Sequence, residues 1–292
     1  MSAKLIEGGP IAEKIKEEVR SAVAGMAKPP KLAAVLATDN PGAKFYAKSQ
    51  ASACEEVGIE YELHDPERTG PLGTSDEMKA YIRKLNGESS LTGVILLMPV
   101  PDGVDAREVQ LDIAPEKDVE GVHPANIGRL FYGDFSLAPC TAHAVLRMLQ
   151  EAEVDLKGQE TVVVGHSEIV GKPALVMLLR SVMESPTVTS CHIATRDLAS
   201  HTKRADILVV AAGKAGLVKG AMVKPGAVVI DVGINRVKVE DGGKKKTRIV
   251  GDVEFDAAKE VASAITPVPG GVGMVTTALL LANVVECARR QQ

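Results

Sequence analysis

The chain has 292 residues, of which 45% are hydrophobic and 25% are charged, and its formal net charge is −4 at pH 7. This length suffices for about two domains, and the composition is typical of soluble globular proteins. The slight acidic excess, the lack of Trp and an aromatic content of 3% argue against a nucleic-acid-binding surface.

The amino terminus and the cysteines indicate a reduced, cytoplasmic protein. Residues 1–10 carry Lys4 and Glu7 and do not resemble a signal peptide. No apolar run approaches the roughly 18 residues of a membrane helix, so we expect no membrane partner. The four cysteines lie far apart without metal-ligand spacing, so we expect no metal site. They are Cys54, Cys140, Cys191 and Cys287.

Short apolar segments alternate with helix-length segments along the whole chain. In the first half we expect helices at 5–26, 46–57 and 78–85 and strands at 32–37, 59–63 and 93–98. After a loop-rich stretch at 121–141, we expect strands at 161–164, 187–191, 207–211 and 228–232 and helices at 173–182 and 276–290. Continuously apolar strands favour parallel sheets covered by helices on both faces. The sequence therefore predicts an α/β fold of two units joined near Pro139.

Residues 161–173 form the strongest local motif. An apolar strand ends at Gly165, and a helix follows Gly171. Backbone N–H groups at such a turn, with a helix N-terminus behind them, suit a pyrophosphate. Because Ser167 replaces the middle glycine of G-x-G-x-x-G, an ordinary α/β turn is an equally good interpretation. No carboxylate follows the next strand before Asp197, so the ribose-binding acid of many NAD sites is missing.

Three other segments carry candidate functional residues. Residues 266–273 contain two prolines and three glycines, which suit either a surface turn or a stiff loop against a ligand. The carboxylates of residues 117–123 could bind a polar ring edge, although capping and turning the chain is the commoner role. Tyr46, followed by Lys48 and Gln50, lies on what is by itself an ordinary amphipathic helix.

Taken together and in this order, the segments resemble the methylenetetrahydrofolate dehydrogenase–cyclohydrolase family over essentially the whole chain. The resemblance rests on Tyr46 before residues 55–59, and on residues 93–101, 117–121, 139–141, 165–173, 231–235, 251–253 and 266–273. It implies two domains around a cleft and usually a homodimer. Residues 1–138 would be the folate-binding catalytic domain, completed by the C-terminal helix 276–292, and residues 139–275 a Rossmann-like NAD(P)-binding domain.

The family oxidises 5,10-methylenetetrahydrofolate to the 5,10-methenyl cation in one-carbon metabolism, and most members hydrolyse the cation to 10-formyltetrahydrofolate. The resemblance implies catalytic roles for Tyr46, Gln50 and Glu120. It places Leu97, Pro269, Gly270 and Gly273 at the substrate. It places Gly165, His166, Ser167, Gly171, Ile193 and Ile234 at the NAD or NADP cofactor.

Several of these positions depart from the family pattern. Gln50 stands where the family has its catalytic lysine, Leu97 stands where it has a glutamine, and Glu120 replaces an aspartate. His166 replaces the arginine of Gly-Arg-Ser, and Ile193 replaces a small polar residue. The last two changes remove partners of the NADP 2′-phosphate, so we expect NAD to be preferred.

The replacement of lysine by Gln50 has different consequences for hydride transfer and for hydrolysis of the methenyl cation. Hydride transfer from the folate needs two rings held in contact but no ionisable side chain. Hydrolysis of the methenyl cation requires water activation, to which a titratable group contributes about 10²–10⁴-fold. We therefore expect a dehydrogenase with weak or lost cyclohydrolase activity. The alternatives are an ordinary bifunctional enzyme, a non-catalytic folate- or nucleotide-binding paralogue, and a dehydrogenase of the same fold for another substrate.

Overall fold

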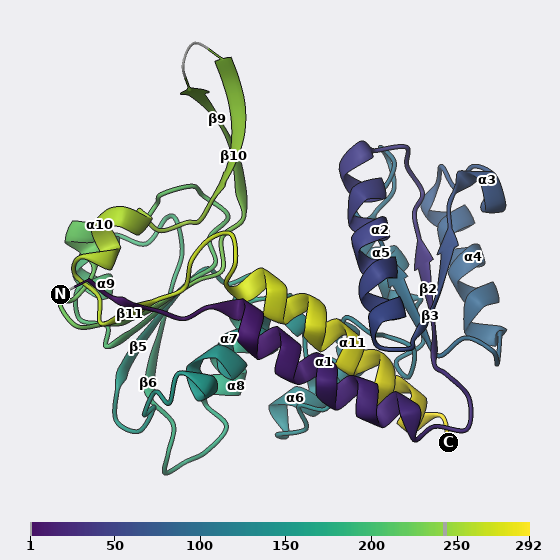
Figure 1. The fold of residues 1–292 in the computed structure, drawn as a ribbon, viewed down its shortest axis with the longest axis horizontal. Coiled ribbons are helices and arrows are strands. Elements are labelled where there is room, and N and C mark those ends of the chain that lie inside the picture. The colour runs from purple at the N-terminus through teal and green to yellow at the C-terminus, as the bar shows by residue number, and fades with distance from the viewer. Residues whose placement is uncertain (1, 242–243) are drawn as a thin grey trace. The chain divides into compact units, whose positions relative to one another are not determined.

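The computed structural model describes residues 2–241 and 244–292, and the chain divides into two compact α/β units (Figure 1). Unit 1 comprises Met1–Ala12 and Thr141–Thr276. Unit 2 comprises Glu13–Cys140 and Thr277–Gln292. The long helices α1 (Gly8–Ala24) and α11 (Val272–Arg290) therefore contribute residues to both units. The predicted α/β class with two units is confirmed.

Unit 1 contains a parallel sheet of six strands. In chain order they are β1 (Lys4–Leu5), β5 (Glu160–Val164), β6 (Thr187–Cys191), β7 (Ile207–Val210), β8 (Val228–Asp231) and β11 (Ala264–Ile265). Their order in the sheet is β1-β11-β8-β7-β5-β6. All four residues of β7 are buried, as are the last four of β5, which explains their continuously apolar sequence.

Helices cover both faces of this sheet. They are α7 (Cys140–Glu151), α8 (Gly171–Leu178), α9 (Leu198–Thr202), the 3₁₀ turn η1 (Gly220–Met222) and α10 (Phe255–Lys259). Figure 1 shows α9 and α10 on one side of the sheet and α7 and α8 on the other. This arrangement follows from right-handed crossovers, because the chain reverses its direction across the sheet after β6. An antiparallel hairpin, β9 (Asn235–Asp241) and β10 (Lys244–Val250), extends away from the sheet.

The first residues of the chain belong structurally to unit 1. β1 pairs in parallel with β11, and the Ile6 N–H donates to the Ile265 carbonyl at 2.9 Å. The expected first domain began at residue 1, whereas the compact unit 2 begins at Glu13. A strand of two residues is too short to leave a periodic pattern in the sequence, which is why pattern analysis missed it.

Unit 2 contains a three-stranded parallel sheet in the order β3-β2-β4. The strands are β2 (Lys31–Val35), β3 (Glu60–His64) and β4 (Gly93–Leu96). The helices are α2 (Pro41–Glu56), α3 (Pro66–Thr69), α4 (Ser75–Gly87), α5 (Ala106–Leu111) and α6 (Pro124–Phe131). Figure 1 shows α2 and α4 on opposite sides of this sheet.

Helix α2 begins five residues before the predicted start. Asn40 caps it by accepting from the N–H groups of Gly42 at 2.9 Å and Ala43 at 3.1 Å, and Pro41 occupies the first turn. Helix α4 also begins earlier than predicted, at a capping box formed by Thr74 and Glu77. In both cases the capping residues, rather than the apolar periodicity, determine the start.

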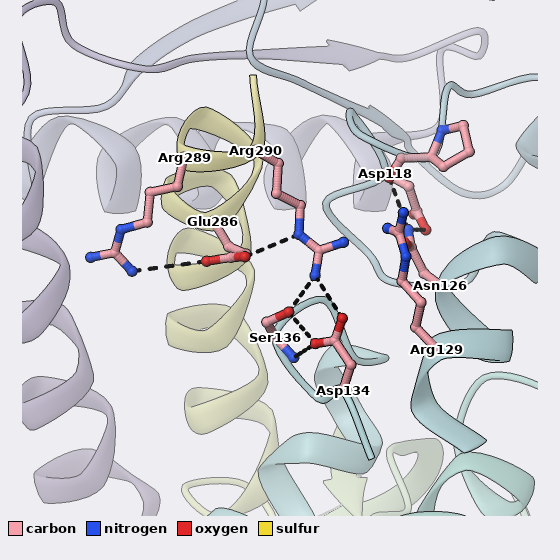
Figure 2. A network of polar contacts seen from close by, with 9 residues as sticks. Asp118, Asn126, Arg129, Asp134, Ser136, Glu286, Arg289 and Arg290 are labelled. Atoms are coloured by element: carbon pink, nitrogen blue, oxygen red, sulfur yellow. Dashed lines mark hydrogen bonds and ion pairs between the residues drawn. The ribbon is translucent and has the colours of Figure 1, made fainter. Parts of the chain in front are cut away.

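The C-terminal helix α11 closes unit 2. By length and apolar composition it could cross a membrane, but more than half of that stretch is buried in the protein. Asn283 donates to the carbonyl oxygens of Val119 at 2.9 Å and Ala138 at 3.1 Å. Figure 2 shows Arg290 bound to Glu286 and Asp134, which secures the end of the helix. The helix is therefore a core element.

Candidate active site

Gln50 lies on the buried face of α2 in unit 2. That face also carries Ala43, Ala47 and Cys54, at helical spacing. The residue is 1% exposed, and its Oε1 accepts a hydrogen bond from the Tyr61 hydroxyl at 3.1 Å. Its Nε2 is buried and has no hydrogen-bond partner among residues 2–241 and 244–292. A buried donor without a partner is unfavourable, so this amide is a candidate for binding a ligand.

Tyr46 and Glu120 are the other predicted catalytic residues of unit 2. Although 45% of Tyr46 is exposed, the desolvation of its hydroxyl raises the phenol pKa to about 12, and the charge of Glu120 adds to the effect. The phenol is therefore a hydrogen-bond donor at neutral pH. The electrostatic effect of Glu120 on Tyr46 indicates that the structure brings the two side chains near each other.

Glu120 is a partly buried carboxyl group with a perturbed titration. Its pKa is raised from 4.5 to about 7, mainly by burial and also by the charge of Asp118, while a 3.4 Å hydrogen bond from the Gln110 amide opposes the rise. A carboxyl group that titrates near neutral pH is typical of functional sites. Sequence analysis had not singled out Gln110, which contacts Glu120 from the end of α5.

The two residues before Val119 have structural roles. Lys117 Nζ donates to the carbonyl oxygens of Leu85, Asn86 and Glu88 at 2.7–3.1 Å. Asp118 accepts from the N–H groups of Gly121 at 3.1 Å and His123 at 2.8 Å. It also accepts from Asn126, as Figure 2 shows. For Lys117 and Asp118 the capping interpretation therefore holds, and Glu120 is the carboxylate left to meet a ligand.

Leu97 directly follows β4 and is 1% exposed. It offers no polar group and almost no free surface in this structure. Its predicted contact with the substrate would therefore require the neighbouring side chains to move.

The titration of Glu120 makes the stability of the protein depend on pH. Because its pKa is higher in the folded chain than in the unfolded chain, its stabilising contribution is complete below about pH 4.5 and is lost as the pH rises through about 7. We expect Glu120→Gln to raise the free energy of unfolding at pH 8 relative to wild type, and to raise it less at pH 5. Urea denaturation at both pH values tests this, with the exposed Glu116→Gln as control. An equal effect of Glu120→Gln at both pH values would contradict the assigned shift.

The turn between β5 and α8 in unit 1 depends on two glycines. Gly165 has φ 122°, and a Cβ there would lie 2.1 Å from the Ala211 carbonyl oxygen. A Cβ on Gly171 would lie 2.0 Å from the Gly165 carbonyl oxygen. The Ser167 hydroxyl accepts from the Val170 N–H at 3.2 Å inside the turn, and α8 begins without a side-chain cap. The residues thus fit a backbone cradle for a pyrophosphate at a helix N-terminus.

The position of this turn in the sheet also suits a dinucleotide. Strand β5 lies between β6 and β7, so the chain crosses to β6 on one side and returns to β7 on the other. In open α/β sheets, ligands bind at such a switch point, outside the carboxyl ends of the strands. Gly165 directly follows β5, and Ile193 is the second residue after β6, where it is 64% exposed.

His166 stacks on His192, with ring centroids 4.8 Å apart and planes inclined by 22°. His192 lies at the end of β6 and was not among the predicted cofactor residues. Of the two, His166 stands at the position where the family pattern has an arginine. Sequence spacing carried no signal for the stacking, because it depends on the pairing of β5 with β6.

A second group of predicted residues lines a cavity of about 190 Å³ in unit 1. The cavity is formed by residues 231–234, Ile249 and residues 267–274. Predicted Ile234, Pro269, Gly270 and Gly273 all line it. The proline- and glycine-rich segment therefore forms the wall of a cavity.

Two buried aspartates hold this region together. Asp231 accepts from the N–H groups of Gly233 at 3.0 Å and of Asp252 and Val253 at 2.9 Å each. Asp252 accepts from the N–H groups of Ala212 at 2.7 Å and Gly213 at 2.8 Å. Each carboxylate thus binds loop segments that lie far apart in the sequence and holds them at the carboxyl end of the sheet.

The predicted site residues fall into one group in unit 2 and two groups in unit 1. Unit 2 carries Tyr46, Gln50, Leu97 and Glu120. In unit 1 the first group is Gly165, His166, Ser167 and Gly171 in the β5–α8 turn, with Ile193 after β6. The second group lines the cavity and consists of Ile234, Pro269, Gly270 and Gly273. Sequence reasoning missed Tyr61, Gln110 and His192 as members, because each is brought in by a contact between separate elements.

Comparisons with known proteins agree with this geometry. Residues 6–120 match the catalytic domain of tetrahydrofolate dehydrogenase/cyclohydrolase, and residues 139–292 match its NAD(P)-binding domain. The chain is 48% identical over 289 residues to bifunctional protein FolD 3 of Roseobacter denitrificans, covering 99% of this chain and 97% of the relative.

Two solved structures are similar over nearly their whole length. The bifunctional methylenetetrahydrofolate dehydrogenase/cyclohydrolase FolD of Campylobacter jejuni is 39% identical with a TM-score of 0.88, and each chain is covered completely. The Trypanosoma brucei dehydrogenase-cyclohydrolase, solved with NADP and an inhibitor, is 33% identical with a TM-score of 0.89, covering 99% of this chain and 98% of that one.

Proposed function

This chain belongs to the tetrahydrofolate dehydrogenase/cyclohydrolase family, and we propose that it oxidises 5,10-methylenetetrahydrofolate with NAD or NADP and then hydrolyses the methenyl product. The observation that carries the proposal is the match of both family domains along one chain, with a bifunctional relative 48% identical. The names of the relatives favour the bifunctional alternative over the loss of hydrolysis that the sequence suggested.

Unit 2 supplies the proposed folate-binding groups. The Glu120 carboxylate accepts paired hydrogen bonds from the amino-pyrimidinone edge of the pterin. The Tyr46 hydroxyl donates a hydrogen bond near the one-carbon unit. The Gln50 amide, which is 1% exposed, does the same once the side chains that cover it move. Leu97 contributes an apolar contact if its neighbours move. The folate nitrogen lone pair drives hydride departure, so these side chains orient the substrate and need not accept a proton.

Unit 1 supplies the proposed dinucleotide-binding groups. When bound, the nicotinamide ring is the acceptor of the hydride. The turn from Gly165 to Gly171, including Ser167, holds the pyrophosphate through backbone N–H groups. Ile234, Pro269, Gly270 and Gly273 shape the cavity wall that excludes water from the reacting rings. No metal ion takes part in this scheme.

NAD is the proposed cofactor of choice. His166 and Ile193 stand where a partner of the 2′-phosphate would be, and Ile193 offers it no hydrogen bond. The ratio of kcat/KM for NAD to that for NADP, measured with methylenetetrahydrofolate, tests the preference. A strong NADP advantage contradicts it.

A dehydrogenase with weak hydrolysis is a second candidate, and Gln50 is the specific observation that favours it. A carboxamide does not ionise near neutral pH and cannot accept the proton of an attacking water. If this candidate is correct, methenyl product accumulates at steady state. Rapid enzyme-dependent loss of the methenyl absorbance supports the bifunctional proposal instead.

The decisive experiment measures binding and turnover separately. Thermal shift with NAD, NADP and a folate analogue is followed by a hydride-transfer assay on the same preparation. We expect stabilisation by both ligand classes and reduction of the nicotinamide. Binding without turnover would indicate a non-catalytic paralogue and contradict the proposal. The proposal also includes a cytoplasmic homodimer, which sedimentation at micromolar concentration tests for oligomeric state.

A further inference from the structure

The side-chain amide of Gln50 is fixed at one end and unpaired at the other. Its Oε1 accepts from the Tyr61 hydroxyl at 3.1 Å, whereas Nε2 is buried and has no hydrogen-bond partner. At 1% exposure the amide has almost no access to bulk water. Two donor hydrogens at this position therefore require an acceptor that the described protein does not provide.

Tyr61 holds the Oε1 end of the amide in this structure. It lies in β3, while Gln50 lies on α2, so the two meet through the packing of α2 against the sheet. A phenol has a single donor hydrogen, and here that hydrogen is given to Oε1. Rotation of the amide by 180° would replace this hydrogen bond with one from Nε2 to the phenol oxygen, and would leave Oε1 as the buried end without a partner.

Gln50 lies one helical turn after Tyr46, another residue of the proposed folate site, on α2. Burial raises the pKa of the Tyr61 phenol, and the neighbouring Tyr46 raises it further. The charge of Glu120 in turn contributes to the raised pKa of the Tyr46 phenol. Tyr61, Tyr46 and Glu120 are thus close enough to interact electrostatically, and Gln50 is bonded to the first of them.

We propose that Tyr61 is a positioning residue, which holds the Gln50 carboxamide so that its –NH₂ group donates to a carbonyl oxygen or lone-pair nitrogen of the bound folate. This inference rests on the proposed function. A neutral donor forms the same hydrogen bond at any pH from 5 to 9, and it does not repel a cationic one-carbon unit as an ammonium would. The contact therefore contributes to folate binding without adding a pH dependence.

The test compares Tyr61→Phe with a matched loss of a hydroxyl elsewhere in unit 2. The Tyr81 hydroxyl lies 2.7 Å from Nδ1 of His64, so Tyr81→Phe removes a partly buried hydrogen bond away from Gln50. We expect Tyr61→Phe to raise the KM for methylenetetrahydrofolate about tenfold, the effect of one hydrogen bond, with the KM for NAD or NADP unchanged. Tyr81→Phe should change neither KM.

A double-mutant cycle separates positioning from a general structural effect. In a Gln50→Met background the amide is absent, so Tyr61→Phe should change the folate KM by less than twofold. An unchanged KM in the Tyr61→Phe variant overturns the proposal. An equal rise of KM in the presence and absence of Gln50 also overturns it.

A second readout does not depend on activity. In protein labelled with [¹⁵N]glutamine, the –NH₂ signals of Gln50 are those that disappear in Gln50→Met. We expect Tyr61→Phe to shift them and to speed their hydrogen exchange, and Tyr81→Phe to leave them unchanged. Unchanged signals in Tyr61→Phe overturn the positioning role. If wild type binds no folate analogue while the signals respond as expected, the proposed function fails and the positioning of the amide by Tyr61 stands.

Discussion

Gln50→Lys is expected to raise the rate of methenyl hydrolysis by about 10²–10⁴-fold if the second candidate function is correct, since that is the typical contribution of a titratable group to such a step. The substituted side chain enters a site where the native residue is 1% exposed. Burial disfavours the charged form of an amine and lowers its pKa, so a fraction of the lysine is neutral and able to accept a proton. Dehydrogenase activity should change far less.

The measurement follows loss of the methenyl absorbance with and without enzyme across pH 6–9. We expect the gained activity to rise with pH as the amine loses its proton. Ser49→Lys, at an exposed neighbouring position of α2, is the control and should gain no hydrolysis. Leu97→Gln is added to Gln50→Lys as a companion variant, because Leu97 stands where the family has a glutamine. Fast hydrolysis by wild type, with no gain in any variant, would establish the bifunctional enzyme and contradict the second candidate.

Asp231→Ala is expected to lower the free energy of unfolding by about 3 kcal/mol or more. The substitution leaves three buried backbone N–H groups without their acceptor, and each such loss costs about 1–3 kcal/mol. The same groups support the cavity wall, so NAD(P) affinity should fall with stability. Urea denaturation followed by circular dichroism measures the change. Asp256→Ala, on the exposed first turn of α10, is the control.

The ionisation of Asp231 gives this prediction a pH dependence. Burial raises its pKa from 3.8 to about 6, despite the opposing backbone hydrogen bonds. Because the folded pKa exceeds the unfolded one, the titration of Asp231 opposes folding increasingly as the pH rises from about 4 to about 6. Asp231→Asn should remove this dependence. An Asp231→Ala variant as stable as Asp256→Ala would show that the carboxylate does not hold these loops.

The parallel sheets of two α/β units could be predicted, but their strand order and several elements could not. Strands such as β5 and β7 are buried on both faces, and their continuous apolar runs identified them. Helix α6, which His123 caps, lies inside the stretch expected to be loop-rich. It was missed because its Pro124 and Gly128 are residues typical of loops. Strand β11 and helices α5, α9 and α10 were not predicted because they are short. The twelve-residue helix α7 was also not predicted.

The candidate site could be predicted only in part. Family resemblance led to Gln50 and Glu120, and the glycines of the β5–α8 turn followed from a strand-to-helix pattern. The partners of these residues did not follow, because Tyr61 reaches Gln50 across the packing of α2 on β3. Likewise, the stacking of His166 on His192 depends on the pairing of β5 with β6.

The amino-acid sequence alone determined the fold class, through local periodicity, and the family, through the resemblance of several motifs in their order along the chain. Only the tertiary structure decided that Lys117 and Asp118 are structural, that Glu120 titrates near neutral pH and that one end of the Gln50 amide is free. Those properties depend on burial and on hydrogen bonds between segments distant in sequence. No pattern along the chain records them, since desolvation is produced by the folded surroundings of a group.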